Sequence, residues 1–457
     1  MEIEKFQVFE LTRGRTEEFF AKLDKRIHRP ADVQHQQHLD RVTAFGAHLN
    51  VQPAFTRCAI DCAVNIELFN RAVTGKAAQP AHRDLDVAGA EFARVVEVLK
   101  FAFFPDFERA LVLRSMERID ESLHAFDVSI ILAPQNAQPW LDSALMLLSA
   151  RRYRQGWYRH EFRWRTSQFN NPRAGIAALQ TTRRVYRTDF DSKSCCLVWA
   201  EQGVGDEVMF GSMLGDFRSC VGKLLVQLDR RLIPLFKRSL PDDVEFFERG
   251  TVVPEDRYDS HIAIGSLGQY LRPTLESFEG KGGKYLWADP ERIQAMREWL
   301  SVKEGERVIG LSWRSSNPET GAARSLALKD LVKSLQAPGV RFVNLQYGDV
   351  SAEIEALERD EGITVLQCPG LDTTDDLDGL AALIEACDEV VSIGNATAHL
   401  AGALGKKTTV LLPKAPSWRW LAEGESTPWY TSVALLRNAG ALPWADFLTA
   451  RGTTRGY

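Results

Sequence analysis

The sequence predicts a helical region followed by two α/β halves of the Rossmann type, and three observations support this fold class. Residues 1 to about 165 contain few glycines and repeat their apolar positions every three or four residues, as amphipathic helices do. From about Leu197, apolar runs of strand length alternate with helix-like stretches, the pattern of a parallel sheet covered on both faces. The pattern fades across the glycine-rich residues 277–292 and then restarts. We therefore predict three domains, over residues 1–170, 171–285 and 286–457.

The composition restricts the class of protein. The 457 residues suffice for two or three domains with cores of their own, and 45% hydrophobic with 26% charged residues excludes a disordered or fibrous chain. A net charge of −5 disfavours a surface that neutralises nucleic acid or an anionic membrane. We find no secretory signal and no run of about 18 apolar residues. The seven cysteines lack paired spacing, so we expect reduced thiols in a cytoplasmic protein.

Small residues recur at a fixed period in the helical region. Ala110 and Ala144, and likewise Ser122 and Gly156, are 34 positions apart, at places where paired helices approach closely. The pattern resembles the tetratricopeptide repeat (TPR), with units at about 103–136 and 137–170. The alternative is an irregular helical bundle.

Residues 156–165 place aromatic residues among cations, in the order GWYRHEFRWR. Such a segment is compatible with single-stranded nucleic acid stacked on a basic platform. The acidic net charge and the helical spacing of Trp157, Phe162 and Trp164 favour a helix that buries its aromatics against the next domain. Its arginines are then expected to extend into water.

The strands of the two α/β halves can be placed by their apolar runs. In the first half we expect CCLVWA, KLLVQL, VEFF and HIAIGS, and in the second RVIGLSW, RFVNLQY, ITVLQC, EVVSIG and TTVLLP. Two such halves joined by residues 277–292 predict a cleft, with ligands at the carboxyl ends of the strands.

The first candidate site is Glu201–Glu207, between the strand CCLVWA and an apolar helix. Its glycines allow a sharp turn at the strand end, and Gly205, Asp206 and Glu207 then lie at the start of the helix. A carboxylate here either accepts a proton from an acceptor hydroxyl or caps the helix, and spacing alone favours the cap. A third glycine at the dinucleotide-binding offset is missing, which disfavours NAD.

The second candidate site follows the strand EVVSIG. Small residues and the unsatisfied amides of a helix start predict a site for a phosphate or diphosphate, with close helix–sheet packing as the structural alternative. His399 is either a donor to an oxygen of the ligand or a hydrogen-bonded core residue. The residues are Gly394, Asn395, Ala396, Thr397, Ala398 and His399.

The third candidate set lies at other strand ends of the second half. Arginine can fork onto phosphate oxygens, so Arg314 and Arg324 are candidates for contact with a nucleotide phosphate. The alternative is an ion pair with Asp372 or Asp376. Neighbouring members of the set are Trp313, Gln346 and Tyr347.

Other signals carry little weight. His35 and His38 lack a third ligand at matching spacing, so we predict no metal site, and no Ser–His–Asp or Walker A pattern occurs. Cys58 and Cys62 lie on one helical face and are expected to pack.

The order of the motifs carries a resemblance that no single motif does. GVGDE, SW-R, RSL, LQYGD, DLDGLAALIEACD, SIGNATAHLAGALGK, PSWRWL and STPWY follow one another over about residues 85–440. This order resembles bacterial proteins in which TPR repeats are fused to a GT-B glycosyltransferase domain. That domain is similar to the heptosyltransferases and, more distantly, to the O-linked N-acetylglucosamine transferases; the flagellin glycosyltransferase type is the variant that it resembles.

The resemblance implies an inverting transfer that requires no metal and no cofactor. Asp206 matches the carboxylate that such enzymes use as general base, with the acceptor on the first half. The donor, a sugar linked to CMP, UDP, GDP or ADP, lies on the second half. Its phosphate departs toward the amides of residues 394–398, helped by Arg314 or Arg324. Where heptosyltransferases carry Asp-Thr-Gly or similar, this chain has Gly394-Asn395-Ala396, so the identity of the donor is open.

Three functions follow as hypotheses. The first is an enzyme that glycosylates a protein, with flagellin as the candidate acceptor held by the helical repeats. The flagellin type further implies a nonulosonic acid carried by CMP, because an amide at Asn395 avoids repulsion of an acidic sugar. The second is a repeat adaptor whose GT-B part has lost catalysis, and the third, least favoured, is a sugar-nucleotide epimerase.

Overall fold

The computed structural model describes residues 106–114, 116–169, 179–187, 193–315, 321–440 and 442–452. The chain divides into two compact units, residues 1–105 with 127–133 and residues 106–126 with 134–457. Of the first unit, residues 127–133 are described, and residues 127–132 belong to a helix. The predictions for His35, His38, Cys58 and Cys62 lie outside the described residues.

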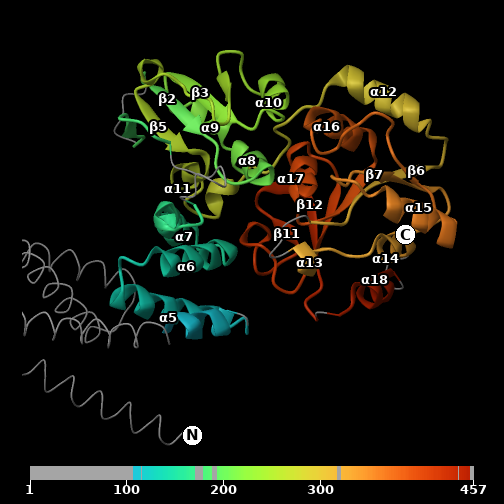
Figure 1. The fold of residues 1–457 in the computed structure, drawn as a ribbon, viewed down its shortest axis with the longest axis horizontal. Helices are drawn as coiled ribbons and strands as arrows, with labels where there is room; N and C mark the ends of the chain where they lie inside the picture. Colours follow the sequence, from blue (N-terminus) through green and yellow to red (C-terminus); the bar gives the residue numbers. More distant parts are fainter. Residues whose placement is uncertain are drawn as a thin grey trace, which may run out of the picture. The chain divides into compact units, whose positions relative to one another are not determined.

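Helices open the described chain, and their close approaches use small residues (Figure 1). After the helical residues 106–114 come α5 (Ile119–Leu132), α6 (Ala137–Ser149) and α7 (Tyr153–His160). The Ser122 hydroxyl donates to the carbonyl oxygen of Ala110 at 2.7 Å, and both residues are fully buried. A Cβ on Gly156 would lie 2.8 Å from the Leu148 side chain, so a larger residue would push α7 from α6. The small residues thus act as predicted, whereas their assignment to TPR units stays a prediction.

Trp157 of the aromatic segment packs inward, and so do two of the segment's arginines. Trp157 on α7 is 1% exposed, and its Nε1 donates to the carbonyl oxygen of Arg272 at 2.8 Å. The prediction that the arginines extend into water is wrong for Arg159 and Arg163, which are 4% and 0% exposed. Arg163, in the short helix η1 (Glu161–Arg165), holds both oxygens of Glu201 at 2.8 Å. This forked ion pair offsets the cost of removing the guanidinium from water.

The first sheet is parallel, with strand order β1-β5-β2-β3-β4. Its strands β2, β3, β4 and β5 show the order of half a Rossmann fold. The strands are β1 (Arg184–Val185), β2 (Cys195–Trp199), β3 (Lys223–Leu228), β4 (Glu245–Glu248) and β5 (Ser260–Ala263). The helices between and after them are α8 (Val204–Gly211), α9 (Leu214–Arg218), α10 (Ile233–Ser239), η3 (Glu255–Arg257), η4 (Ile264–Leu267), α11 (Gly268–Leu271) and η5 (Glu276–Phe278).

The second sheet has the order β11-β12-β10-β9-β6-β7-β8, and only β11 is antiparallel to its neighbour. Its parallel strands follow the full Rossmann order. The strands are β6 (Arg307–Ser312), β7 (Val340–Asn344), β8 (Val365–Leu366), β9 (Glu389–Ile393), β10 (Thr408–Leu412), β11 (Ser426–Thr427) and β12 (Tyr430–Arg437). The helices are α12 (Pro290–Leu300), α13 (Gly321–Arg324), α14 (Leu328–Leu335), α15 (Ser351–Glu361), α16 (Leu377–Ala386), α17 (Ala396–Ala403), η6 (Trp418–Trp420) and α18 (Trp444–Gly452).

The predicted α/β architecture is therefore confirmed, with differences in detail. The run ITVLQC forms only the two-residue strand β8, and the run HIAIGS turns into the short helix η4 after Ala263. The strand β12, eight residues long, was not expected from the sequence. Within the described ranges, no helix combines the length and the apolarity that crossing a bilayer requires.

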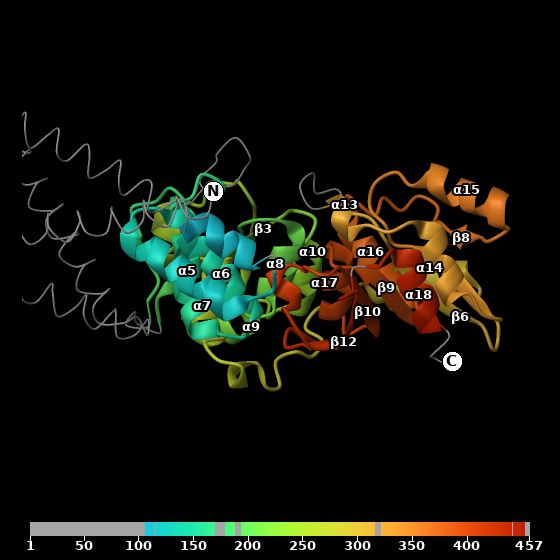
Figure 2. The ribbon, with the colours of Figure 1, turned by 90° about the horizontal axis from the view of Figure 1, so that it is seen from below.

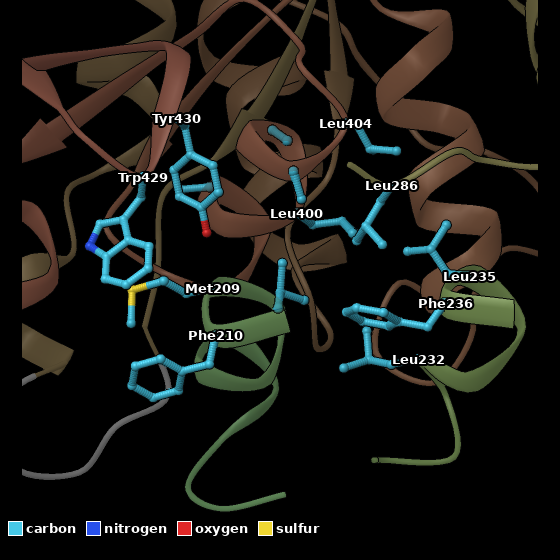
Figure 3. Packing of buried hydrophobic residues seen from close by; sticks show 14 of the residues in the cluster. Met209, Phe210, Leu232, Leu235, Phe236, Leu286, Leu400, Leu404, Trp429 and Tyr430 are labelled. Carbon is cyan, nitrogen blue, oxygen red and sulfur yellow. The ribbon is translucent and has the colours of Figure 1, made fainter. Parts of the chain in front are cut away.

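One hydrophobic core joins the two sheets. Met209 and Phe210 of α8 lie near Leu400 of α17 and near Trp429 and Tyr430 (Figure 3). The predicted linker takes part in this packing, because the Tyr285 and Leu286 amides donate to the Ala403 carbonyl at 3.0 and 3.1 Å. Apolar burial therefore places the starts of α8 and α17 beside each other, and both views of the fold show the two helices together (Figures 1 and 2).

Candidate functional site

The loop after β2 carries the predicted proton acceptor. Gly203 precedes the first residue of α8, so Asp206 lies in the first turn, where the helix dipole favours a negative charge. Its Oδ2 is 3.5 Å from the Gly203 amide, at the limit of a hydrogen bond. The stronger partner of the carboxylate is Arg419, whose Nε donates to Oδ1. Asp206 is therefore at most a weak cap, and its main contact comes from the other half of the molecule.

Gly205 sets how closely the two helix starts approach. A Cβ at this position would lie 3.1 Å from Cδ2 of His399 and 3.4 Å from Cα of Ala396. The structure thus brings the GVGD turn and the Asn395 turn, which are remote in sequence, into direct contact. The catalytic and binding roles of these residues stay predictions.

Glu207 points away from Asp206 and is completely buried. Its carboxylate accepts from the Asp229 amide at 2.7 Å and from Nη1 of Arg249 at 3.0 Å. Burial raises the pKa of Glu207 to about 7, although Arg249 opposes this shift. Arg249 also donates to the carbonyl oxygen of Gln202 at 2.6 Å, so Glu207 holds the loop in place from inside.

The amide side chains of the second half tie its strand ends together. Oε1 of Gln346 accepts from the Trp313 and Arg314 amides at 2.9 and 2.8 Å. Nδ2 of Asn395 donates to the Ser312 hydroxyl at 2.8 Å, and its Oδ1 caps α17 through the Ala398 amide. Gln346 and Asn395 are 1% and 8% exposed. Their side chains therefore position the backbone around the candidate site.

The amides at the start of α17 are only partly used. The Asn395 amide donates to the Ile393 carbonyl oxygen at 2.8 Å, and the Ala398 amide donates to Oδ1 of Asn395 at 3.3 Å. The Thr397 hydroxyl reaches the Leu345 carbonyl oxygen at 3.4 Å. Gly394 packs against the indole of Trp420, since a Cβ at this position would be 2.5 Å from Nε1 of Trp420. The turn is thus built by close packing and still offers the first amides of a helix, which is the arrangement that suits an anion.

His399 is buried within an aromatic group. Its Nδ1 lies 3.0 Å from the Tyr430 hydroxyl, and its ring stacks on Trp420 with centroids 4.5 Å apart. Burial, together with the nearby Arg419, lowers the pKa of His399 to about 3. The imidazole is therefore neutral at physiological pH, which matches the core interpretation of this residue.

The two predicted arginines differ in their surroundings. Arg314 pairs with Glu353, a carboxylate that the sequence did not single out, and Trp313 donates to the same group at 2.8 Å. Asp376, one of the expected alternatives, is occupied by Arg292. Arg324 has neither a hydrogen bond nor an ion pair among the described residues, and burial and the neighbouring Arg419 lower its pKa. Tyr347 lies close to Arg324.

Arg419 is a member of the site that the sequence did not predict. Arg419 lies in η6, after β10, and its Nη2 donates to Oε1 of Gln202 at 2.9 Å. The motif PSWRWL places a cation between aromatic residues beyond a strand end, which is the signal that was available. Only the fold shows that this cation reaches Asp206.

A separate cavity lies on the second half. It has a volume of about 360 Å³, and the loops after β7 and β8 form its walls. Its lining includes Asn344, Gly348, Asp349, Asp372 and Thr374. In the described part of the chain, no three His, Cys, Asp or Glu side chains lie close enough to hold a metal ion.

No protein-family model matches the chain. It is 34% identical over 354 residues to protein FlbA of Caulobacter vibrioides, an alignment that covers 72% of this chain and 58% of FlbA. The chain thus spans little more than half the length of this relative.

Several solved structures are similar over parts of the chain. A glycosyl transferase family 9 structure from Veillonella parvula has 10% identity and a TM-score of 0.40, covering 57% of this chain and 89% of that one. The ADP-heptose lps heptosyltransferase II of E. coli has 15% identity and a TM-score of 0.39, with 57% and 98% covered. A Thermobaculum terrenum O-GlcNAc transferase mutant has 13% identity and a TM-score of 0.28, with 86% and 90% covered.

Proposed function

We propose that the protein is a glycosyltransferase that moves a sugar from a nucleotide-sugar to a protein acceptor. The observation that carries the proposal is the contact between the two helix starts. It places Asp206 beside the α17 turn and in contact with the Arg419 guanidinium, which in turn lies near Arg324. A carboxylate next to cations and helix amides is what general-base attack on a phosphate-activated carbon requires.

The chemistry assigns a role to each group. Asp206 takes the proton of the acceptor hydroxyl as its oxygen forms a bond to the anomeric carbon. The bond from that carbon to the phosphate oxygen breaks, and the electron pair leaves with the nucleotide. Attack opposite to the leaving group inverts the anomeric configuration. Arg324 and the first amides of α17 stabilise the departing phosphate, so we expect transfer without a divalent cation.

The resemblance in sequence supplies the proposed acceptor, flagellin, held by the helical region in the cytoplasm. It does not select the sugar. The argument that Asn395 favours an acidic CMP-linked sugar is weakened, because its Nδ2 is used by Ser312 and by the Arg314 carbonyl. The donor is therefore best found with a panel of CMP-, UDP-, GDP- and ADP-sugars.

The test is nucleotide release and product mass with this panel, with EDTA present. Replacing Asp206 with Asn should lower turnover by about 10²- to 10⁴-fold, because the acceptor loses its base. Asp360→Asn, an exposed carboxylate paired with its neighbour Arg359, serves as the control and should leave turnover unchanged. Intact-mass analysis of flagellins from cells with and without the protein identifies acceptor and sugar together. Unchanged product with Asp206→Asn would favour the adaptor hypothesis.

A further inference from the structure

Arg419 contacts the side chains of both Gln202 and Asp206, which lie at the two ends of the GVGD loop. Its Nε donates to Asp206, and its Nη2 donates to Gln202 at 2.9 Å. Its own segment supports it weakly, through Ser417 at 3.0 Å and the face of Trp418, whose ring centroid is 5.0 Å away. The guanidinium thus belongs to the second half by sequence and to the first half by its contacts.

Gln202, which Arg419 contacts, has a strained backbone and an unsatisfied side-chain donor. Gln202 has a φ of 63°, in the left-handed region that non-glycine residues rarely adopt. Its Nε2 is buried without a hydrogen-bond partner while its Oε1 accepts from Arg419. A strained backbone and an unsatisfied buried donor persist where the surroundings impose them, and they cluster at functional sites.

The charges around Arg419 are not balanced. Arg324 approaches it closely enough to be affected by its charge and has no carboxylate of its own in the described ranges. Of these two neighbouring guanidinium groups, Arg419 is the one that the structure shows bound to the Asp206 carboxylate. An anion between the two arginines would relieve their repulsion and would compete with Asp206 for Arg419.

We propose that Arg324 and Arg419 form one site for the phosphate of the donor, and that donor binding transfers Arg419 from Asp206 to that phosphate. The proposal rests on the proposed function and adds an order of events to it. While Arg419 is bound to Asp206, the carboxylate is engaged. When the phosphate takes the guanidinium, Asp206 becomes free to accept the proton of the acceptor. Donor binding thus precedes activation of the base.

The transfer can be tested by calorimetric binding of inorganic diphosphate to the full-length protein. Asp206→Asn removes the competitor for Arg419 and should tighten diphosphate binding about fivefold, the effect of losing one partly buried ion pair. Arg419→Gln and Arg324→Gln should each weaken binding about tenfold or more. In the Arg419→Gln background, Asp206→Asn should no longer tighten binding, because there is no guanidinium left to release.

The controls separate this mechanism from general electrostatics and from misfolding. Arg359→Gln removes an exposed guanidinium that pairs with Asp360, and it should leave the affinity unchanged. If Arg419→Gln unfolds, Arg419→Lys replaces it, since one ammonium cannot hold Asp206 and Gln202 with the same fork. Equal tightening by Asp206→Asn with and without Arg419 would overturn the transfer. The transfer would also be overturned if the protein turned over a donor while Arg419→Gln left its affinity for diphosphate unchanged. Absence of both diphosphate binding and donor turnover would overturn the proposed function and the transfer with it.

Discussion

Asp206 and Glu207 are neighbours in the chain and have opposite surroundings. Asp206 faces Arg419 across the contact between the two halves, whereas Glu207 is completely buried against Arg249 and the Asp229 amide. Helical geometry explains the difference, since consecutive residues point about 100° apart. The sequence predicted both as residues at a helix start. The sequence could not show which of the two faces the candidate site, because this depends on which face of α8 packs against α17.

Glu207 predicts a pH dependence of stability. Burial raises its pKa from 4.5 to about 7 in the folded protein, so the folded state holds the proton more tightly than the unfolded chain. Its contribution is fully present below pH 4.5 and is lost as the pH rises through about 7, on the order of 3 kcal/mol. Urea midpoints between pH 5 and 8 should fall more steeply for the wild type than for Glu207→Gln. Parallel pH profiles of the two proteins would contradict this account.

At the scale of elements, helix ends illustrate local rules that hold in the structure. α12 begins with Asp289 capping two amides and with Pro290 in the first turn, as sequence rules predict. α15 ends at Gly362 with φ 68°, whereas α12 ends at Ser301 with φ 46°. Strand ends are less predictable. β12 was not expected because its sequence, YTSVALLR, does not alternate apolar and polar residues regularly.

The two helix ends predict opposite effects of exchanging glycine and serine. Ser301→Gly should raise the free energy of unfolding by about 0.5–1 kcal/mol, because glycine adopts the left-handed conformation without strain. Gly362→Ser should lower it by a similar amount, and no atom lies within 4 Å of the added Cβ position to confuse the result. Thermal unfolding should shift by about 2 °C in opposite directions. A shift of the same sign in both variants would show that contacts, not backbone conformation, decide.

At the scale of the whole molecule, a buried ion pair connects the helical segment to the first sheet. Arg163 and Glu201 have side chains that are 0% and 1% exposed, and Ser266 and Gly265 complete their hydrogen bonds. Glu201 immediately precedes Gln202, so this ion pair and Arg249 hold the candidate site from two sides. The same helical segment reaches the second half, where Trp157 meets Trp418 with ring centroids 6.0 Å apart.

Removing one partner of this pair should be costly. Glu201→Gln leaves the Arg163 guanidinium buried without a full counter-charge and should lower the free energy of unfolding by about 3–5 kcal/mol. Asp243→Asn is the matched control, because its ion pair with Arg218 is 55% exposed at the carboxylate and should contribute less than about 1 kcal/mol. Chemical unfolding followed by tryptophan fluorescence measures both. Equal losses for the two variants would mean that burial of the Arg163 pair adds nothing.

The sequence by itself determined what depends on local periodicity and on backbone conformation. It predicted the parallel strands of both halves, the glycine turn before Asp206 and the small-residue turn at Asn395. Because parallel strands end at the same edge of a sheet, it also predicted which residues would gather there. Tertiary structure alone decided which partners these residues meet. Arg419 contacts Asp206, which lies 213 positions away in the sequence. The buried Arg163 pairs with Glu201, and the side-chain amide of Asn395 donates to the Ser312 hydroxyl. Such pairings arise from the packing of distant segments, and no local pattern in the sequence encodes them.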